Sequence, residues 1–168
     1  MKLSSQALLL FILFIYVLPV TASASRPKVD EYCKVDYFSK TNAGTYKGQC
    51  IDNTPYGPGI VEFYNGDMIE GYFKDGQLNG AATMTAANGN IYNGEVVNGR
   101  RHGKGTLVWA RGSRYVGEWV DDKRHGDGIF TWSNGSRFEG EFRDNKRYSG
   151  MYYTNNGRVL KCRMGKCR

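Results

Sequence analysis

Apolar and aromatic residues recur along this chain in short alternating runs. The run Tyr115-Val-Gly117-Glu-Trp119 places its tyrosine, glycine and tryptophan on one side of an extended chain and the residues between them on the other. A second run, in which Phe130 and Trp132 alternate with smaller or polar residues, follows within the same copy. This alternation predicts two short β-strands per copy, each with one apolar face.

The same landmarks return at a fixed interval. Tyr92 and Tyr115 open two matching copies, 23 residues apart (115 − 92 = 23). Shifted by that interval, copies begin at Tyr46, Ile69, Tyr92, Tyr115 and Phe138. Such self-similarity indicates one small unit stacked repeatedly. Residues 36–45 look like a worn half-copy and the fifth copy loses register, which is typical of units that cap an array.

Glycine accounts for 22 of the 168 residues and follows the same period. One glycine comes two residues after each of the five starts, and a pair comes eleven and thirteen residues after most of them. We expect these glycines to leave room for aromatic rings, which stack from copy to copy into a column that forms the core. Pairs such as Asn65-Gly66, Asn88-Gly89 and Asn134-Gly135 favour two-residue hairpin turns.

Tyr-x-Gly-x-Trp, then Gly-x-Gly, then an aromatic residue before Asn-Gly, at this spacing, resembles the MORN repeat. The resemblance covers Tyr46 to about Val159 and is closest over Tyr115–Arg137, while the preceding copy departs mainly at Val96 and Arg111. It implies an all-β fold: an elongated, single-layer antiparallel ribbon of about five β-hairpin units. It also implies a module for protein interaction or membrane apposition, as in junctophilins, with any chemistry in a separate domain.

The chain divides into four segments. Residues 1–24 have a short positive start, an apolar run and a small-x-small site at Ala22-Ser23-Ala24, which predicts a signal peptide cleaved after Ala24 and a secreted, extracellular protein. An uncleaved signal anchor is the alternative, although the run is shorter than the roughly 20 residues of a spanning helix. The rest comprises an N-terminal segment with the half-repeat (25–45), the repeat array (46–160) and a basic, cysteine-containing tail (161–168).

Four cysteines lie outside or at the edge of the central copies: Cys33, Cys50, Cys162 and Cys167. An even number in an exported protein favours disulfides, and three pairings are open. We favour Cys33–Cys50 and Cys162–Cys167, because the ends of an array have one neighbour only and fray most easily. A metal site is the alternative, but the chain lacks a Cys-x-x-Cys pair and a convincing histidine partner for one.

Asn134-Gly135-Ser136 is an N-glycosylation sequon, and it falls on a predicted, exposed turn. Asn134 is therefore a candidate glycosylation site in an exported eukaryotic protein. The turn alone also explains the Asn-Gly pair, and the two interpretations are compatible.

Positive charge is concentrated in the second half of the chain. Residues 25–90 carry 6 basic and 8 acidic residues, whereas residues 91–168 carry 16 and 8. Six basic residues keep the repeat period and define a basic ladder: Arg100, Arg101, Lys123, Arg124, Lys146 and Arg147. We expect this ladder along one edge of the ribbon. There it either keeps an exposed edge soluble and unpaired or binds an anionic partner such as a lipid headgroup or a sulfated glycan.

Motifs for catalysis are missing from the chain, among them Gly-x-Ser-x-Gly, His-Glu-x-x-His and phosphate-binding loops. We therefore predict a secreted, non-catalytic binding or scaffold protein that uses an extended repeat surface for protein interaction. We expect no cofactor, metal or nucleic-acid partner, and the oligomeric state is left open. The first alternative is peripheral binding to anionic lipid or sulfated glycan through the basic ladder. A secreted enzyme or lytic effector is the second.

Overall fold

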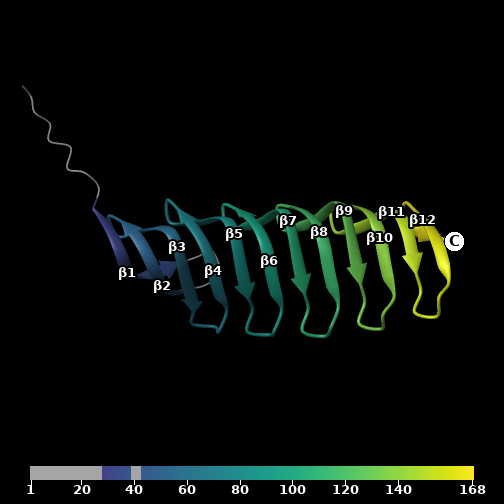
Figure 1. Ribbon diagram of the computed structural model, residues 1–168, viewed down its shortest axis with the longest axis horizontal. Coiled ribbons are helices and arrows are strands. Elements are labelled where there is room, and N and C mark those ends of the chain that lie inside the picture. Colours follow the sequence, from purple (N-terminus) through teal and green to yellow (C-terminus); the bar gives the residue numbers. More distant parts are fainter. Residues whose placement is uncertain (1–27, 39–42) are drawn as a thin grey trace, which may run out of the picture.

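The computed structural model describes residues 28–38 and 43–168, so the predicted signal peptide lies outside the described residues. Within them, thirteen strands form one antiparallel sheet, and their order in the sheet is their order in the chain (Figure 1). The strands are β1 Val29–Phe38, β2 Ala43–Ile51, β3 Thr54–Phe63, β4 Met68–Lys74, β5 Gln77–Thr85, β6 Ile91–Val97, β7 Arg100–Val108, β8 Arg114–Val120, β9 Lys123–Thr131, β10 Arg137–Arg143, β11 Lys146–Tyr153, β12 Val159–Arg163 and β13 Lys166–Cys167.

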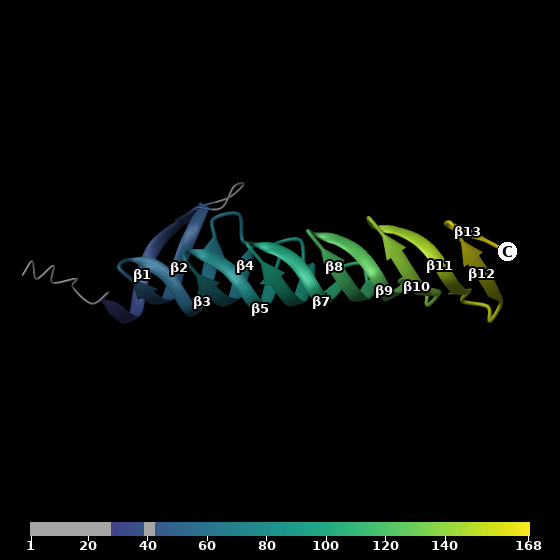
Figure 2. The same cartoon turned by 90° about the horizontal axis from the view of Figure 1, so that it is seen from above.

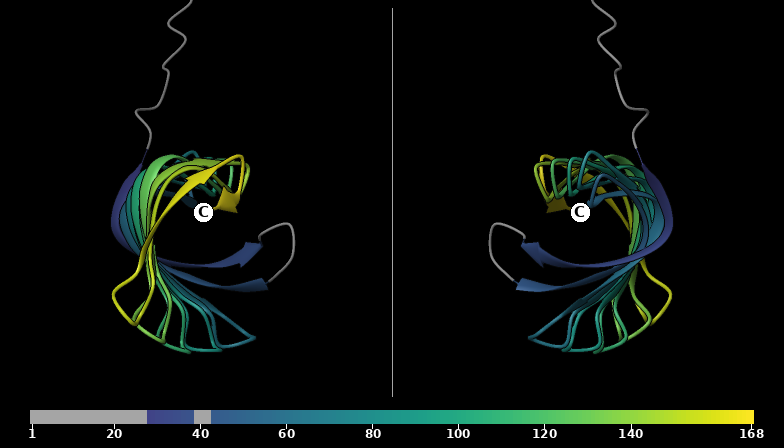
Figure 3. Two further views of the ribbon diagram at one scale, coloured as in Figure 1. Left: turned by 90° about the vertical axis from the view of Figure 1, so that its right-hand side faces the viewer. Right: turned by 90° about the vertical axis from the view of Figure 1, so that its left-hand side faces the viewer.

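The sheet is a long, single-layer ribbon. Its strands lie side by side along the long axis of the molecule in two perpendicular views (Figures 1 and 2). Seen along that axis, the sheet curls into an open trough (Figure 3). Sheet twist produces such curvature, and a single layer can enclose side chains only on its concave side. The all-β ribbon of hairpins expected from the sequence is confirmed. Among the described residues, no helix is long and apolar enough to cross a membrane.

Each full copy is a hairpin closed by a two-residue turn. In the copy that starts at Tyr92, Asn98 and Gly99 join β6 to β7 with positive φ angles of 49° and 74°. Turns of this type match the right-handed twist of the flanking strands, and Asp, Asn and Gly tolerate them best. We call this side of the sheet the tight-turn edge; its other turns are Asp52-Asn53, Asp75-Gly76, Asp121-Asp122, Asp144-Asn145 and Met164-Gly165.

The Asn-Gly pairs lie on the opposite edge, in longer loops between copies. Residues 86–90 connect β5 to β6, and the Gly89 nitrogen donates a hydrogen bond to the Ala86 oxygen at 2.8 Å. Gly89 has a φ of 84°, whereas Asn88 is not left-handed. The prediction of two-residue turns at these pairs is therefore wrong: Asn88 and Gly89 are the last two residues of a four-residue turn. We call this side the loop edge.

A tyrosine ring and a pair of glycines fit together in the core. Tyr92 is only 2% exposed, and its hydroxyl donates a hydrogen bond to the Glu95 carbonyl oxygen at 2.8 Å. Gly94 and Gly105 face each other across β6 and β7. A Cβ on either glycine would collide with the Tyr92 side chain. The expected role of these glycines is confirmed, and it recurs where Tyr46 meets Gly48 and Gly59 and where Tyr115 meets Gly117 and Gly128.

Aromatic side chains meet edge to face within a copy and between successive copies. The rings of Tyr92 and Trp119 are 5.6 Å apart, those of Trp119 and Tyr115 are 5.2 Å apart, and those of Tyr115 and Phe142 are 5.1 Å apart. Such pairs add about 0.5–1.5 kcal/mol each beyond the apolar area that they bury. The predicted column is confirmed, and it gives a one-layer sheet a continuous core.

Disulfides close both ends of the described ribbon. Cys33 of β1 is bonded to Cys50 of β2, and Cys162 of β12 is bonded to Cys167 of β13. These are the two pairings favoured from the sequence. The segment assigned to the tail, residues 161–168, contributes to β12 and forms β13, so it continues the sheet.

Candidate functional site

The basic ladder lies on the tight-turn edge. Its three pairs are the first two residues of β7, β9 and β11, and each pair directly follows a tight turn. Because consecutive residues of a strand point to opposite faces, the two members of each pair separate. Arg101, Arg124 and Arg147 turn towards the core rings. Arg100, Lys123 and Lys146 are exposed on the other face.

All three inward arginines lie against the core rings, and Arg101 and Arg124 also bind the next tight turn. The Arg101 guanidinium lies 4.4 Å from the centre of the Trp119 ring. Its Nε forms an ion pair with Asp122 Oδ1 at 2.9 Å, one copy further on. Arg124 repeats the arrangement, since its Nη2 donates to the Asn145 carbonyl oxygen at 2.9 Å. A guanidinium both stacks on rings and donates in a fixed fork, so these arginines join neighbouring copies.

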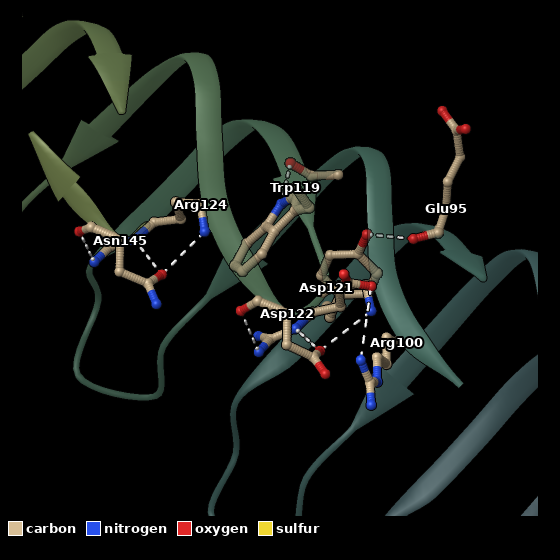
Figure 4. Close-up of polar contacts among 10 residues, drawn as sticks. Glu95, Arg100, Trp119, Asp121, Asp122, Arg124 and Asn145 are labelled. Atoms are coloured by element: carbon tan, nitrogen blue, oxygen red, sulfur yellow. Dashed lines mark hydrogen bonds and ion pairs between the residues drawn. The ribbon is translucent and has the colours of Figure 1, made fainter. Parts of the chain in front are cut away.

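Two of the three outward residues are paired as well. Arg100 Nη1 lies 3.8 Å from Asp121 Oδ1 (Figure 4), and Lys123 Nζ lies 3.3 Å from Asp144 Oδ1. Exposed ion pairs of this kind contribute about 0–1 kcal/mol. Lys146 has no ion pair among the described residues. The six predicted ladder residues therefore occupy three different settings.

An apolar hollow of about 320 Å³ opens on the concave face near the middle of the array. Its walls come from β3 to β7 and the loop edge, and Met84 and Trp109 are partly buried in it. Asp67, Asn90 and Arg101 add polar atoms to the lining. Its further apolar lining residues are Phe63, Met68, Ile69, Ala86, Tyr92 and Leu107. We call this feature the apolar hollow.

A cationic hollow of about 510 Å³ opens nearer the C-terminal end. It is lined by Arg124, Phe130, Trp132, Phe142, Asn145, Lys146, Arg147, Met164 and Gly165. The lining thus combines three cations with three aromatic rings and includes no carboxylate.

Half-buried rings connect the two hollows. Trp109 of the apolar hollow lies 5.3 Å from Phe130, measured between ring centres. Phe130 lies 4.6 Å from Trp132, and Trp132 lies 5.4 Å from Tyr152. These rings pack beside the column but remain partly exposed. Two hollows joined by a row of partly exposed rings therefore lie along the concave face, and the hollow nearer the C-terminal end carries more positive charge. We call this surface, the two hollows and the rings between them, the groove.

Burial raises the pKa of Tyr92 and of Tyr115 to about 12, although Arg101 and Arg124 respectively oppose the shift. Both hydroxyls therefore stay protonated at neutral pH and donate to backbone oxygens. Burial also lowers the pKa of Arg124. These pKa shifts are a consequence of packing in the core. Among the described residues, no group of three or more His, Cys, Asp or Glu side chains could hold a metal ion.

The candidate glycosylation site lies on the loop edge, where Asn134 is exposed between β9 and β10. Its Oδ1 accepts hydrogen bonds from the Ser136 nitrogen at 3.0 Å and the Ser136 Oγ at 2.7 Å. Ser136 is only 2% exposed. The sequon thus forms a local turn with its asparagine on the outside.

Sequence reasoning missed the division of the ladder and the two hollows. Alternation along a strand separates Arg100 from Arg101, so period-2 patterning could have found the division. The hollows depend on how the sheet curls across several copies, and no single copy encodes that curvature.

A comparison with known families matches the MORN repeat at residues 70–91, 92–114, 115–137 and 138–147. Three of these matches begin at copy starts read from the sequence: Tyr92, Tyr115 and Phe138. The matches begin at residue 70, yet β2 and β3 form the same kind of hairpin, with Gly48 opposite Gly59. A comparison with curated proteins finds no match.

Proposed function

The chain is a MORN-repeat protein, and from that premise we propose that it is a secreted, non-catalytic scaffold whose concave groove holds an extended segment of another protein. Repeats of this kind bind proteins or membrane lipids. The proposal selects protein as the partner and the groove as the site. Secretion rests on the signal peptide predicted at residues 1–24, and disulfides at both ends of the ribbon fit an oxidising compartment.

The apolar hollow is the observation that supports this proposal. Met84 and Trp109 are partly exposed side chains of types enriched at protein interfaces. Both line the apolar hollow, which has a few polar atoms around it. Apolar hollows with a few well-placed polar groups are typical binding sites in soluble proteins. An extended segment fits a trough better than a globular surface does, because the walls enclose it on both sides.

The basic ladder as a whole is not part of this proposal. Arg101 and Arg124 are engaged with core rings and with the next turn. Arg100 and Lys123 face acidic residues one copy further on. Their charges are therefore largely satisfied within the molecule.

The test uses the mature, disulfide-intact chain, residues 25–168, to select linear peptides from a displayed library. We expect the selected peptides to be apolar at spaced positions and to bind about tenfold more weakly to Trp109→Ala, since losing one buried anchor costs more than 1 kcal/mol. Val108→Ala is the matched control, because Val108 neighbours Trp109 but is exposed on the other face. Peptides that bind the wild type, Trp109→Ala and Met84→Ser equally well would exclude the groove as the site. Circular dichroism confirms that each variant is folded.

A further inference from the structure

We propose that the C-terminal end of the ribbon, centred on the cationic hollow, binds a linear sulfated glycan. This site is separate from the apolar hollow and adds a second ligand to the proposed function. The choice of a sulfated glycan as the ligand rests on the proposed function, in which the protein is secreted, because sulfated glycans are extracellular polymers. We define the cationic end by its basic residues: Lys146, Arg147, Arg158, Lys161, Arg163, Lys166 and Arg168.

The last 23 residues carry a net charge equal to that of the whole chain. Residues 146–168 contain these seven basic residues and no acidic residue, while the net charge of the chain is +7. Arg147 is half-buried and the other six are exposed. Basic and acidic residues therefore balance over the rest of the chain, and the field of the molecule is concentrated at one end.

The repeat explains why Lys146 and Arg147 meet no carboxylate in the part of the chain that the structure describes. In the first pair of the ladder, Arg100 and Arg101 meet Asp121 and Asp122 of the next tight turn. The second pair meets Asp144 and Asn145, which keeps one carboxylate. The next tight turn after Lys146 and Arg147 is Met164-Gly165, which has no charge. Acidic neighbours thus decrease from two to one to none along the ladder.

The cationic hollow has the chemistry of a sulfated sugar site. Arg124, Lys146 and Arg147 line it together, and the Asn145 side chain adds an amide. Guanidinium and ammonium groups bind sulfate oxygens through charge-assisted hydrogen bonds. The Arg147 guanidinium lies 5.3 Å from the centre of the Trp132 ring, so aromatic surface adjoins a cation there. A sugar ring can therefore pack on Trp132 while its sulfate groups contact the cations.

The distribution of charge favours a flexible chain over a flat membrane. Arg147 turns to the concave face, whereas Lys161 and Arg163 are exposed on the other face of β12, on either side of the buried Cys162. Lys166 lies on the terminal strand β13. A bilayer can contact only one of these faces at a time, whereas a linear polyanion can follow the end of the ribbon from one face to the other.

The test measures binding of the mature, disulfide-intact protein to immobilised heparin. The variant is Lys146→Ser/Arg163→Ser/Lys166→Ser. Its matched control is Arg100→Ser/Lys104→Ser/Lys123→Ser, which removes three exposed cations from the middle of the array. We expect the first to lose at least about tenfold in affinity and the second less than about twofold, because the first removes charge from the end that has no acidic residue, whereas the second removes it from a region where basic and acidic residues balance. Binding of the wild type should weaken steeply as salt rises.

The ligand class is tested with desulfated heparin, anionic phosphatidylserine vesicles and single-stranded DNA as competitors. We expect only intact heparin to compete at matched charge. An equal loss of affinity in both triple variants, or stronger binding to vesicles or DNA than to heparin, would overturn the proposal. Trp109→Ala should keep full heparin binding, so failure of the peptide groove and failure of this site give different results.

Discussion

The ring of Tyr92 occupies the space in which a side chain on Gly105 would otherwise stand. One copy earlier, the matching positions hold Ile69 and Ala82, so a smaller residue replaces the ring and a larger one replaces the glycine. A larger side chain at one position is therefore accompanied by a smaller one at the other, because both fill the same space in the core.

We expect Gly105→Ala alone to destabilise the protein by about 1–3 kcal/mol, because it overpacks a filled core. In a Tyr92→Ile background the same substitution should cost much less, since that pair already occurs naturally at Ile69 and Ala82. Urea unfolding of the two single variants and the double variant measures the coupling. Additive losses would show that the ring and the glycine do not share one space.

The two arginines at the start of β7 should differ in their contribution to stability. Arg101→Ala removes a guanidinium from the Trp119 ring and an ion pair with Asp122, and we expect a loss of about 1–3 kcal/mol. Arg100→Ala should change the free energy of unfolding by less than about 0.5 kcal/mol, because its ion pair is exposed. Arg101→Lys should restore only part of the loss, since an ammonium cannot reproduce the planar fork. Equal effects of Arg100→Ala and Arg101→Ala in thermal melts would contradict the assignment of inward and outward roles.

Tyrosine ionisation should limit the alkaline stability of the array. Burial raises the pKa of Tyr115 in the folded state to about 12, from an ordinary value of 10.0. The protonated form is therefore favoured by folding. Its contribution, about 2–3 kcal/mol, is complete below pH 10 and is lost as the pH rises from 10 to 12. The free energy of unfolding, measured from pH 9 to 11.5, should fall less steeply in Tyr115→Phe than in the wild type. Tyr56→Phe, at an exposed ring, is the control and should leave the slope unchanged.

Reduction should loosen the N-terminal end more than the C-terminal end. Cys33 and Cys50 are 17 residues apart, whereas Cys162 and Cys167 are 5 apart. On chain-entropy arguments, closing the longer loop contributes about 3 kcal/mol, roughly 1 kcal/mol more than closing the shorter one. Cys33→Ser/Cys50→Ser should therefore lower the melting temperature more than Cys162→Ser/Cys167→Ser, with faster amide exchange first in β1. An unchanged melting temperature in the presence of a reducing agent would count against a stabilising role for both disulfides.

Asn134 should carry a glycan when the full chain is exported by eukaryotic cells. The expected product has a mass above that of the polypeptide, and peptide N-glycosidase or Asn134→Gln removes the excess. Asn88→Gln is the control, because Asn88 occupies the matching loop position but is followed by Gly89 and Asn90, with no hydroxyl residue. A secreted wild-type protein with the mass of the bare polypeptide would reject the site.

Features encoded within one copy were predictable from the sequence. Alternation identified the strand faces, and the 23-residue period indicated that Tyr92 and the glycines would share a core. The pairing of Cys33 with Cys50 followed from the position of each cysteine at the end of the array. These features depend on neighbours that are close in the sequence, so the pattern contains them.

Turn placement was harder to predict, because both edges of the sheet use Asn, Asp and Gly. Asp121-Asp122 has a weaker turn signature than Asn134-Gly135, yet Asp121-Asp122 forms the two-residue turn. The ion pairing of the basic-ladder residues could not be predicted from the sequence either. Whether Arg101 or Lys146 meets a carboxylate depends on the residues of a turn about one copy later, and on which edge that turn occupies.

The sequential strand order described for residues 28–38 and 43–168 has a consequence for how the protein is made. Each strand pairs with the one synthesised just before it, so hairpins can close as the chain emerges, and none waits for a partner encoded far downstream. The Cys33–Cys50 bond can form first, and each later hairpin can then pair with a hairpin that has already folded. Cys162 and Cys167 lie in β12 and β13, so their bond can form only after the hairpins that precede them have been synthesised.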